Sequence, residues 1–259
     1  MILSVYLHGG LGNQLFQLAF LQNMHERTHG RISIDPAFVV PSPHSADASY
    51  LSTIFAHFQS FKGKLVAYRE IMEKPNMEYD NWYRYRFIFP GGTLLFRGYF
   101  QRYEYIPRSF PSLLRFNTEV AANYPRLHES AFLHIRGGDY LIYRRHFIDL
   151  SGYYKRAIEF YKSRGVQHFY VFTNDKAYAE SLAIVDESTM TYMEEPSEVD
   201  ELYLMTQCKQ GGICANSSFS WWGGYLNQAR PIVLPSKWYS DDMIDTTCLY
   251  YPGSTVIMV

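Results

Sequence analysis

From residue 130 onward, short apolar runs alternate with longer segments in which apolar residues recur at helical spacing. The pattern predicts strands at 130–136, 168–172, 189–193, 212–215 and 231–234. Between them it predicts helices at about 151–164, 176–184 and 218–228, and one that is capped by Ser197 with Asp200 and reaches Cys208. Such alternation is typical of βαβ units, in which helices cover a parallel sheet. The second half of the chain is therefore predicted to be a Rossmann-like α/β domain.

The first half of the chain opens in a similar way. Residues 2–7 are predicted as a strand, the glycine-rich segment 8–13 as a loop, 14–29 as a helix and 31–34 as a second strand. Residues 36–90 resist assignment because prolines interrupt them. The pattern favours another strand at 93–99 and gives helix potential to residues 109–125. The simplest interpretation is two Rossmann-like domains, residues 1–115 and 116–259.

Bulk properties narrow the class of protein. The chain has 259 residues, 47% of them hydrophobic and 19% charged, which is typical of a globular protein with a substantial core. Its net charge of −1 gives no support for nucleic-acid binding. No apolar run is long enough to span a membrane, residues 1–7 do not resemble a signal peptide, and three scattered cysteines suit a reducing compartment. We expect a cytoplasmic protein, with peripheral association at the inner face of the membrane as an alternative.

The segment His134-Ile-Arg-Gly-Gly-Asp-Tyr140 follows the apolar run 131–133 directly. It is expected to deliver His134 and Arg136 to the carboxyl end of a buried strand, where open α/β sheets bind ligands. The planar fork of an arginine matches phosphate oxygens, so Arg136 is a candidate phosphate clamp. The competing interpretation is an ordinary turn with an exposed arginine.

Three further polar clusters lie at predicted strand ends. The loop 8–14 resembles a phosphate-cradling turn, although its glycine spacing is not that of the dinucleotide fingerprint. Asn216 is a candidate helix N-cap, with the hydroxyls of Ser217 and Ser218 among the free amides of a helix start that favours phosphate. Asp175 could accept hydrogen bonds from the N1–H and amino group of guanine, or serve simply as a turn residue.

Taken together and in order, these clusters resemble glycosyltransferase family 11, the α-1,2-fucosyltransferases that use GDP-fucose. The matching segments span nearly the whole chain and are weakest over about 36–90. They are 9–17, 98–101, 134–140, 153–158, 172–175, 202–205, 216–224 and 235–238.

The resemblance implies a GT-B fold, in which two Rossmann-like domains face each other across a cleft and the second binds most of the donor. It implies inverting transfer of L-fucose from GDP-β-L-fucose to the 2-hydroxyl of a terminal galactose, on a surface glycan such as a lipopolysaccharide O-antigen or on an oligosaccharide. The partners implied are thus a GDP-sugar donor and a galactose-containing acceptor, without a metal. The acceptor glycan and the oligomeric state are not readable from the sequence.

The resemblance also implies roles for individual residues. Arg136 would hold the β-phosphate, and Asn13 would reach the reaction centre from the other domain. His134 and Asp175 would contact the guanosine, and Ser217 with Ser218 would bind the diphosphate. The matched motifs add further residues that are expected to bind substrate, namely Gly12, Gln14, Asn216 and Phe219.

Two points remain open in the sequence. Gly137 stands where the family usually has a second arginine, so one positive charge near the diphosphate is missing. Either Arg144, Arg145 or a lysine compensates, or the affinity for the donor or its identity differs. The general base is not identifiable: Asp139 and Asp35 are candidates by type, with His8 a weaker one, and Asp139 could instead pair with Arg136. Two alternatives to fucosyl transfer are the transfer of another GDP-deoxysugar such as colitose and a nucleotide- or glycan-binding module without turnover.

Overall fold

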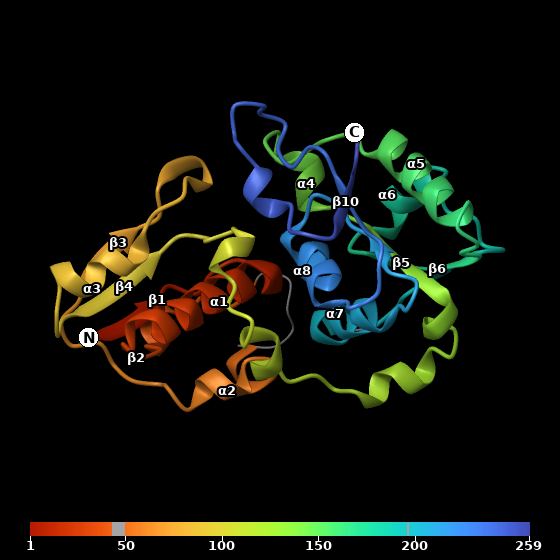
Figure 1. The fold of residues 1–259 in the computed structure, drawn as a ribbon. Coiled ribbons are helices and arrows are strands. Elements are labelled where there is room, and N and C mark those ends of the chain that lie inside the picture. The colour runs from red at the N-terminus through yellow and green to blue at the C-terminus, as the bar shows by residue number, and fades with distance from the viewer. Residues whose placement is uncertain (43–49, 196) are drawn as a thin grey trace. The chain divides into compact units, whose positions relative to one another are not determined.

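The computed structural model describes residues 1–42, 50–195 and 197–259. The chain divides into two compact units, each built around a parallel sheet (Figure 1). The first unit comprises Met1–Phe116 and the short segment Thr247–Leu249, and the second comprises Asn117–Thr246 and Tyr250–Val259. The segment Thr247–Leu249 belongs to the first unit because it packs beside residues 101–105, where the Cys248 Sγ lies 3.5 Å from the Gln101 carbonyl oxygen.

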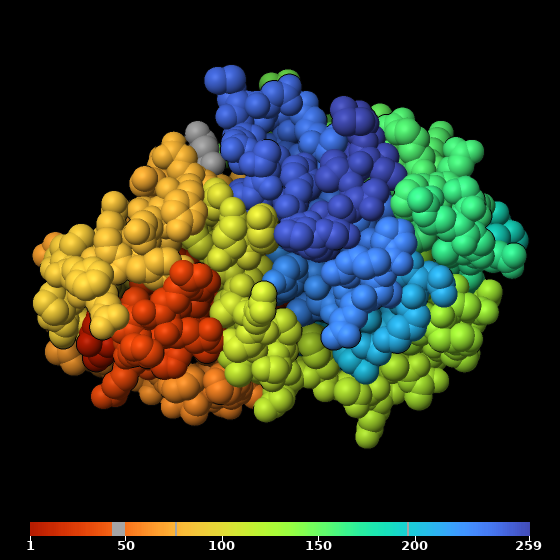
Figure 2. Space-filling view, viewed as in Figure 1, coloured from red at the N-terminus to blue at the C-terminus, as the bar shows by residue number. Residues whose placement is uncertain are grey.

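The first unit contains a four-stranded sheet in the order β2-β1-β4-β3. Its strands are β1 (Ile2–Val5), β2 (Arg31–Ile32), β3 (Arg69–Met72) and β4 (Thr93–Arg97), and its helices are α1 (Leu11–Thr28), α2 (Ala56–Gln59) and α3 (Tyr85–Ile88). Strand β3 is an edge strand, and the yellow-orange segment that carries β3 and α3 forms part of the surface in Figure 2. Helix α1 packs against β1, as the apolar residues on both elements require.

Aromatic side chains fill the core of the first unit. Phe20 of α1 stacks on Phe100 with ring centroids 4.0 Å apart, and Trp82 meets both rings edge-on. Much of the 17% aromatic content therefore serves packing, because large rings bury extensive apolar area.

The second unit contains a six-stranded sheet in the order β10-β9-β8-β5-β6-β7. Its strands are β5 (Ser130–Ile135), β6 (His168–Thr173), β7 (Met190–Tyr192), β8 (Gly212–Ile213), β9 (Ile232–Pro235) and β10 (Ser254–Ile257). Its helices are α4 (Asp139–Ile142), α5 (Ser151–Lys162), α6 (Lys176–Ser181), α7 (Glu198–Gln207) and α8 (Ser218–Leu226), of which α7 and α8 pack against each other (Figure 1).

The strand order reverses at β5, and this reversal determines where a ligand can bind. From β5 the chain proceeds to β6 and β7 on one side, and then returns to place β8, β9 and β10 on the other. The two connections leave the sheet in opposite directions, so a crevice opens outside the carboxyl ends of β5 and β8. The fold thus provides a ligand site between these two strands.

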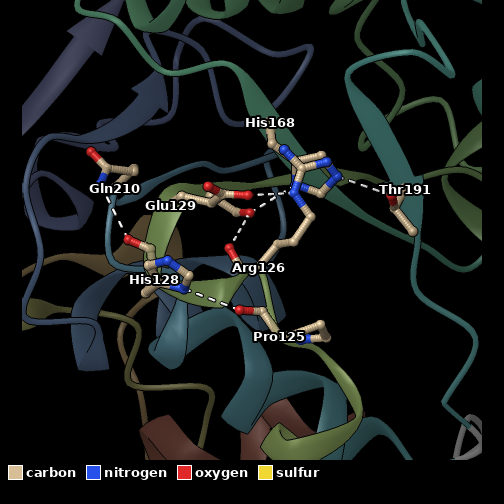
Figure 3. A network of polar contacts seen from close by, with 8 residues as sticks. Pro125, Arg126, His128, Glu129, His168, Thr191 and Gln210 are labelled. Carbon is tan, nitrogen blue, oxygen red and sulfur yellow. Dashed lines mark hydrogen bonds and ion pairs between the residues drawn. The ribbon is translucent and has the colours of Figure 1, made fainter.

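A polar network holds the opposite, amino ends of the strands (Figure 3). The Ser130 hydroxyl donates to the Arg126 carbonyl at 2.6 Å, so its oxygen accepts from Nδ1 of His168 at 2.7 Å. The His168 Nε2 then accepts from the Thr191 hydroxyl at 3.0 Å, and Arg126 pairs with Glu129. These groups satisfy one another's hydrogen-bonding capacity, so the network has a structural role.

Several elements differ from the sequence-based expectation. Helix α1 begins at Leu11 rather than at residue 14, so that Asn13 and Gln14 lie in its first turn. Residues 109–125 form 3₁₀ turns (Phe110–Leu113 and Glu119–Asn123) instead of an α-helix, and Pro111 is consistent with that. Strands β3 and β10 are edge strands whose short segments lack a clear apolar pattern. Among the described helices, none combines the length and apolar character needed to cross a membrane.

Candidate functional site

The carboxyl ends of β5 and β8 bring the predicted donor-site residues together. Arg136 follows the last residue of β5, and Asn216 follows β8. Both line one small pocket with Tyr140, His146 and Tyr178. Residues 80 positions apart in the sequence therefore meet at the crevice that the strand order creates.

Arg136 is held in place by its neighbours in the turn after β5. Its guanidinium donates to the Asp139 carboxylate at 2.6 Å and lies 4.9 Å from the centre of the Tyr140 ring. The Arg136 side chain is 12% exposed, against 33% for Asp139. The Tyr140 ring in turn stacks on His146. The arginine is thus oriented but still reachable at the pocket.

The Gly137-Gly138 turn is closed by side chains from the end of β6. Asn174 Oδ1 accepts from the Gly137 amide, and Asp175 Oδ2 accepts from the Gly138 amide, both at 3.0 Å. The other oxygen of Asp175 caps α6 by accepting from the Tyr178 amide at 3.0 Å. Asp175 is therefore committed to the structure of this edge, and a guanine base would have to share its lone pairs.

The geometry of this turn explains why glycine occupies position 137. A Cβ atom there would lie 2.7 Å from the Asp175 Cβ and 2.9 Å from the Tyr178 Cδ1. Both contacts are closer than real Cβ atoms show, so a larger residue would require Asp175 or Tyr178 to shift. The family's second arginine would not fit this loop as it stands.

Helix α8 begins beside Arg136, but its cap differs from the prediction. The N-cap residue is Ser217, whose hydroxyl makes no capping hydrogen bond. The expectation that Asn216 is the N-cap is wrong, because its amide donates to the carbonyls of His146 and Trp238 at 2.9 and 3.0 Å. Asn216 joins two loops at the rim. The Ser217 hydroxyl, which makes no capping bond within the described residues, lies next to helix-start amides, a favourable place for an anion.

His134 is a buried polar residue at the end of β5. It is 3% exposed and faces Phe219, with ring centroids 5.7 Å apart. Its Nδ1 has no hydrogen-bond partner within the described part of the chain. Burial, helped by the charge of Arg136, lowers the pKa of His134 to about 3. His134 is therefore neutral at physiological pH.

The glycine-rich segment of the first unit forms a tightly bonded turn at the end of β1. Asn13 Oδ1 accepts from the Gln101 amide at 2.8 Å, and the Gln14 amide donates to the carbonyls of Gly9 and Val40 at 3.0 and 3.3 Å. A Cβ at Gly9, whose φ is +78°, would lie 2.6 Å from the Asn13 side chain. Gly12 is buried in the first turn of α1. Asn13 is thus fixed at the carboxyl edge of this sheet.

Asp35 has a structural role. Its two carboxylate oxygens accept from the backbone amides of Ala37 at 2.9 Å and Leu65 at 2.7 Å. These bonds stabilise the ionised form and lower the pKa of Asp35, which makes it a weaker base. It caps the turn after β2 and is a poor candidate for the general base. Among the described residues, no group of three His, Cys, Asp or Glu side chains is arranged to hold a metal ion.

One supporting residue had no signal in the sequence. Glu73 follows β3 and accepts from the Tyr99 and Phe100 amides at 2.6 and 2.9 Å, which shapes the loop after β4. Gly98 leaves room for this carboxylate, because a Cβ there would lie 2.3 Å from the Glu73 Cβ. The partners lie some 25 positions apart in the poorly assigned region, so only the sheet pairing of β3 with β4 reveals the contact.

Comparisons with known proteins show what the chain as a whole is similar to. The model of glycosyl transferase family 11 matches residues 3–253. The O-antigen biosynthesis glycosyltransferase WbnK of Escherichia coli is 34% identical over 122 residues, an alignment that covers 42% of this chain and 38% of that protein. An alpha-1,2-colitosyltransferase of Escherichia coli is 24% identical over 286 residues, which cover 95% of each chain.

Solved structures share the fold. The NodZ alpha-1,6-fucosyltransferase soaked with GDP-fucose matches with a TM-score of 0.50 at 12% identity, over 86% of this chain and 90% of that one. The apo-form of POFUT1 matches with a TM-score of 0.50 at 10% identity, over 85% and 92% of the two chains. Together with the two parallel sheets, these likenesses confirm the predicted α/β class of the GT-B type.

Proposed function

This chain belongs to glycosyltransferase family 11, and from that premise we propose that it transfers L-fucose from GDP-β-L-fucose to the 2-hydroxyl of a terminal galactose. In this reaction the bond between C1 of the sugar and the β-phosphate oxygen breaks, and the acceptor oxygen bonds to C1 from the opposite face. The acceptor hydroxyl releases its proton, so that the products are the glycoside, GDP and H⁺, and the linkage inverts from β to α. The acceptor is a galactose-containing glycan or oligosaccharide.

The observation that carries this proposal is the meeting of Arg136 and the start of α8 at the reversal point of the second sheet. Negative charge develops on the departing diphosphate, and preorganised donors lower the barrier most where that charge forms. Arg136 supplies a cation, while the amides and hydroxyls of Ser217 and Ser218 supply neutral donors at a helix start. These groups take the place of a metal ion, and we propose that the reaction needs none.

The other predicted residues support this centre. Asp139 orients Arg136, as their 2.6 Å contact favours, and we assign it a positioning role rather than that of the base. His134 and Phe219 line the part of the site that would bind guanosine. Asp175 and Asn216 stabilise the loops at the rim of the pocket through their hydrogen bonds to backbone groups. In the first unit, Gly12 and Gln14 shape the turn that presents Asn13 to substrate.

Colitose is the competing donor sugar. The relative that aligns over 95% of both chains is an alpha-1,2-colitosyltransferase. Colitose lacks the 3-hydroxyl of fucose, so the two donors differ in a single hydrogen-bonding group. Discrimination between them depends on whether a buried polar group pairs with that hydroxyl.

The deciding experiment offers the purified protein GDP-fucose and GDP-colitose in parallel, each with lactose or Gal-β1,3-GalNAc. We expect release of GDP and formation of an α-1,2-fucosylated product with at least one acceptor. Transfer only from GDP-colitose would replace fucose by colitose in the proposal. GDP binding without transfer from either donor to any galactoside would overturn it and favour a binding module.

A further inference from the structure

Three rings gather at the carboxyl edge of the first sheet, beside the turn that holds Asn13. They belong to Tyr6 and His8, which follow β1, and to Tyr99, which follows β4. The His8 ring lies 5.1 Å from the Tyr6 ring and 4.7 Å from the Tyr99 ring, between centroids. Tyr99 is 44% exposed, so the cluster reaches solvent.

Gln17 of α1 fixes the protonation of His8. The Gln17 Oε1 accepts from the His8 backbone amide at 3.1 Å, and its Nε2 donates to the Gly98 carbonyl at 3.0 Å. These two bonds determine the orientation of the Gln17 amide, so its second N–H points to Nδ1 of His8 at 2.9 Å. The Tyr6 carbonyl is farther from Nδ1, at 3.2 Å. Nδ1 of His8 therefore accepts a hydrogen bond, and the ring proton is on Nε2.

The Nε2 of His8 is the free end of this arrangement. Within the described chain it has no hydrogen-bond partner, and it is not among the buried unpaired atoms. Burial lowers the pKa of His8; the Tyr6 carbonyl beside Nδ1 opposes this shift, and the nearby charge of Arg97 adds to it. The ring is thus neutral at physiological pH, with an N–H donor facing solvent. A nitrogen that already carries the proton cannot remove one from an acceptor, which argues against His8 as the general base.

The surroundings of Tyr99 make the cluster rigid. Glu73 accepts from the Tyr99 and Phe100 amides, and Phe100 is fully buried against Phe20. On the other side, the guanidinium of Arg97 lies 4.3 Å from the centre of the Tyr6 ring. A rigid aromatic surface with one N–H group that faces solvent suits a ligand that has both an apolar face and hydroxyl groups, as a pyranose does.

We propose that His8 is an acceptor-binding residue whose Nε2–H donates to a hydroxyl of the terminal galactoside while the Tyr99 ring packs against the C–H face of that sugar. The inference rests on the proposed function, because it assigns the acceptor of the same reaction to this edge. It differs from a catalytic role for His8, because the ring binds the sugar and moves no proton.

Two substitutions distinguish the contribution of the His8 N–H group from that of its aromatic ring. His8→Phe keeps an aromatic ring but removes the N–H, and His8→Gln keeps an N–H donor without the ring. His57→Phe, a substitution elsewhere in the same unit, is the control. For each protein we would measure kcat, the acceptor KM, the affinity for GDP, and the dissociation constant of methyl β-galactoside in the presence of GDP.

We expect His8→Phe to raise the acceptor KM and the galactoside dissociation constant about five- to tenfold, the scale of one lost hydrogen bond. His8→Gln should recover part of that loss, with kcat and GDP affinity near the wild type throughout. An unchanged acceptor KM in His8→Phe would overturn the proposal. A fall in kcat of about 100-fold or more with unchanged KM would instead show a proton-transfer role.

The assignment of the His8 tautomer has its own test. Nitrogen-15 NMR of the histidine rings should show His8 protonated at Nε2 and unprotonated at Nδ1 at neutral pH, and the reverse would remove the basis of the inference. Failure of the wild-type protein to transfer sugar to any galactoside would overturn the proposed function itself. Normal wild-type transfer with an unaffected His8→Phe variant would overturn only this assignment.

Discussion

The guanidinium of Arg136 donates to the carboxylate of Asp139 across 2.6 Å, within the turn that leaves β5. The cation proposed to stabilise the departing diphosphate is therefore already oriented before a donor binds. A diphosphate entering the pocket has to share or replace the carboxylate as the partner of Arg136. The consequences of this pair can be measured separately for each residue.

Removal of the cation should abolish most turnover. We expect Arg136→Ala to lower kcat about 10²- to 10³-fold while the protein stays folded, because one preorganised donor at a developing charge is worth about 3–4 kcal/mol. Steady-state kinetics with a circular-dichroism check of folding measures this. Arg164→Ala, just beyond the C-terminal end of α5, is the control. Near-normal kcat in Arg136→Ala would show that the site is misassigned.

The partner of that cation should matter less. Asp139→Asn is expected to lower kcat/KM for the donor about three- to tenfold, the scale of a partly exposed ion pair and its hydrogen bond. The Arg136→Ala/Asp139→Asn double variant should be no slower than Arg136→Ala, because the carboxylate acts through the arginine. A drop of about 100-fold or more in Asp139→Asn, additive with Arg136→Ala, would identify Asp139 as the general base instead.

The glycine at position 137 should be required for packing. We expect Gly137→Ala to reduce the free energy of unfolding by about 1–3 kcal/mol, because its Cβ would overlap Asp175 and Tyr178. Gly92→Ala is the matched control, since the nearest atom to its Cβ is 3.8 Å away. Urea unfolding measures the free energy of unfolding of both variants. Equal values for Gly137→Ala and Gly92→Ala would contradict the tight turn seen at Gly137.

Burial of His134 should make stability depend on pH. The pKa of His134 is about 3 in the folded protein and about 6.5 in the unfolded chain, so only the unfolded state binds the proton between these values. Its contribution to the free energy of unfolding is complete above pH 6.5 and falls by up to about 1.4 kcal/mol per pH unit below it. His134→Leu should flatten that decline from pH 6.5 to 4.5 in urea unfolding. An unchanged slope would mean that His134 takes up a proton in the folded state.

Chelation should leave the reaction intact. With Arg136 and the start of α8 neutralising the diphosphate, we expect the same initial rate in EDTA as in excess Mg²⁺, within about twofold. The assay compares initial rates after the protein has been dialysed against chelator. A loss of rate in EDTA that Mg²⁺ restores would show that the donor binds with a metal ion.

The sequence predicted the central elements of the second unit because they are strongly patterned. The six residues of β5 are all buried, and helix α5 begins at the predicted residue. The pattern also predicted that Arg136 follows this buried strand, and the structure shows Arg136 there, lining the pocket with Asn216. The edge strands β3 and β10 were missed, since an edge strand buries little and shows no clear apolar pattern.

The roles of polar side chains were harder to predict than the elements. Asn216 and Asp35 were both predicted from residue type, and both turn out to satisfy nearby backbone groups. Side chains such as Asn and Asp bond to whichever backbone donors and acceptors the fold presents, and these come from distant segments. Residue type therefore restricts their chemistry without deciding their partners.

The sequence by itself determined the class of fold and the position of Arg136 at a strand end, because both depend on local pattern, and its resemblance to the family exposed the anomaly at Gly137. Only the tertiary structure decided that Asp139 faces Arg136, that Asp175 fills the space beside Gly137, and that Gln17 holds His8 with its proton outward. Contacts between residues distant in the chain depend on strand order and side-chain packing, which local patterns do not encode.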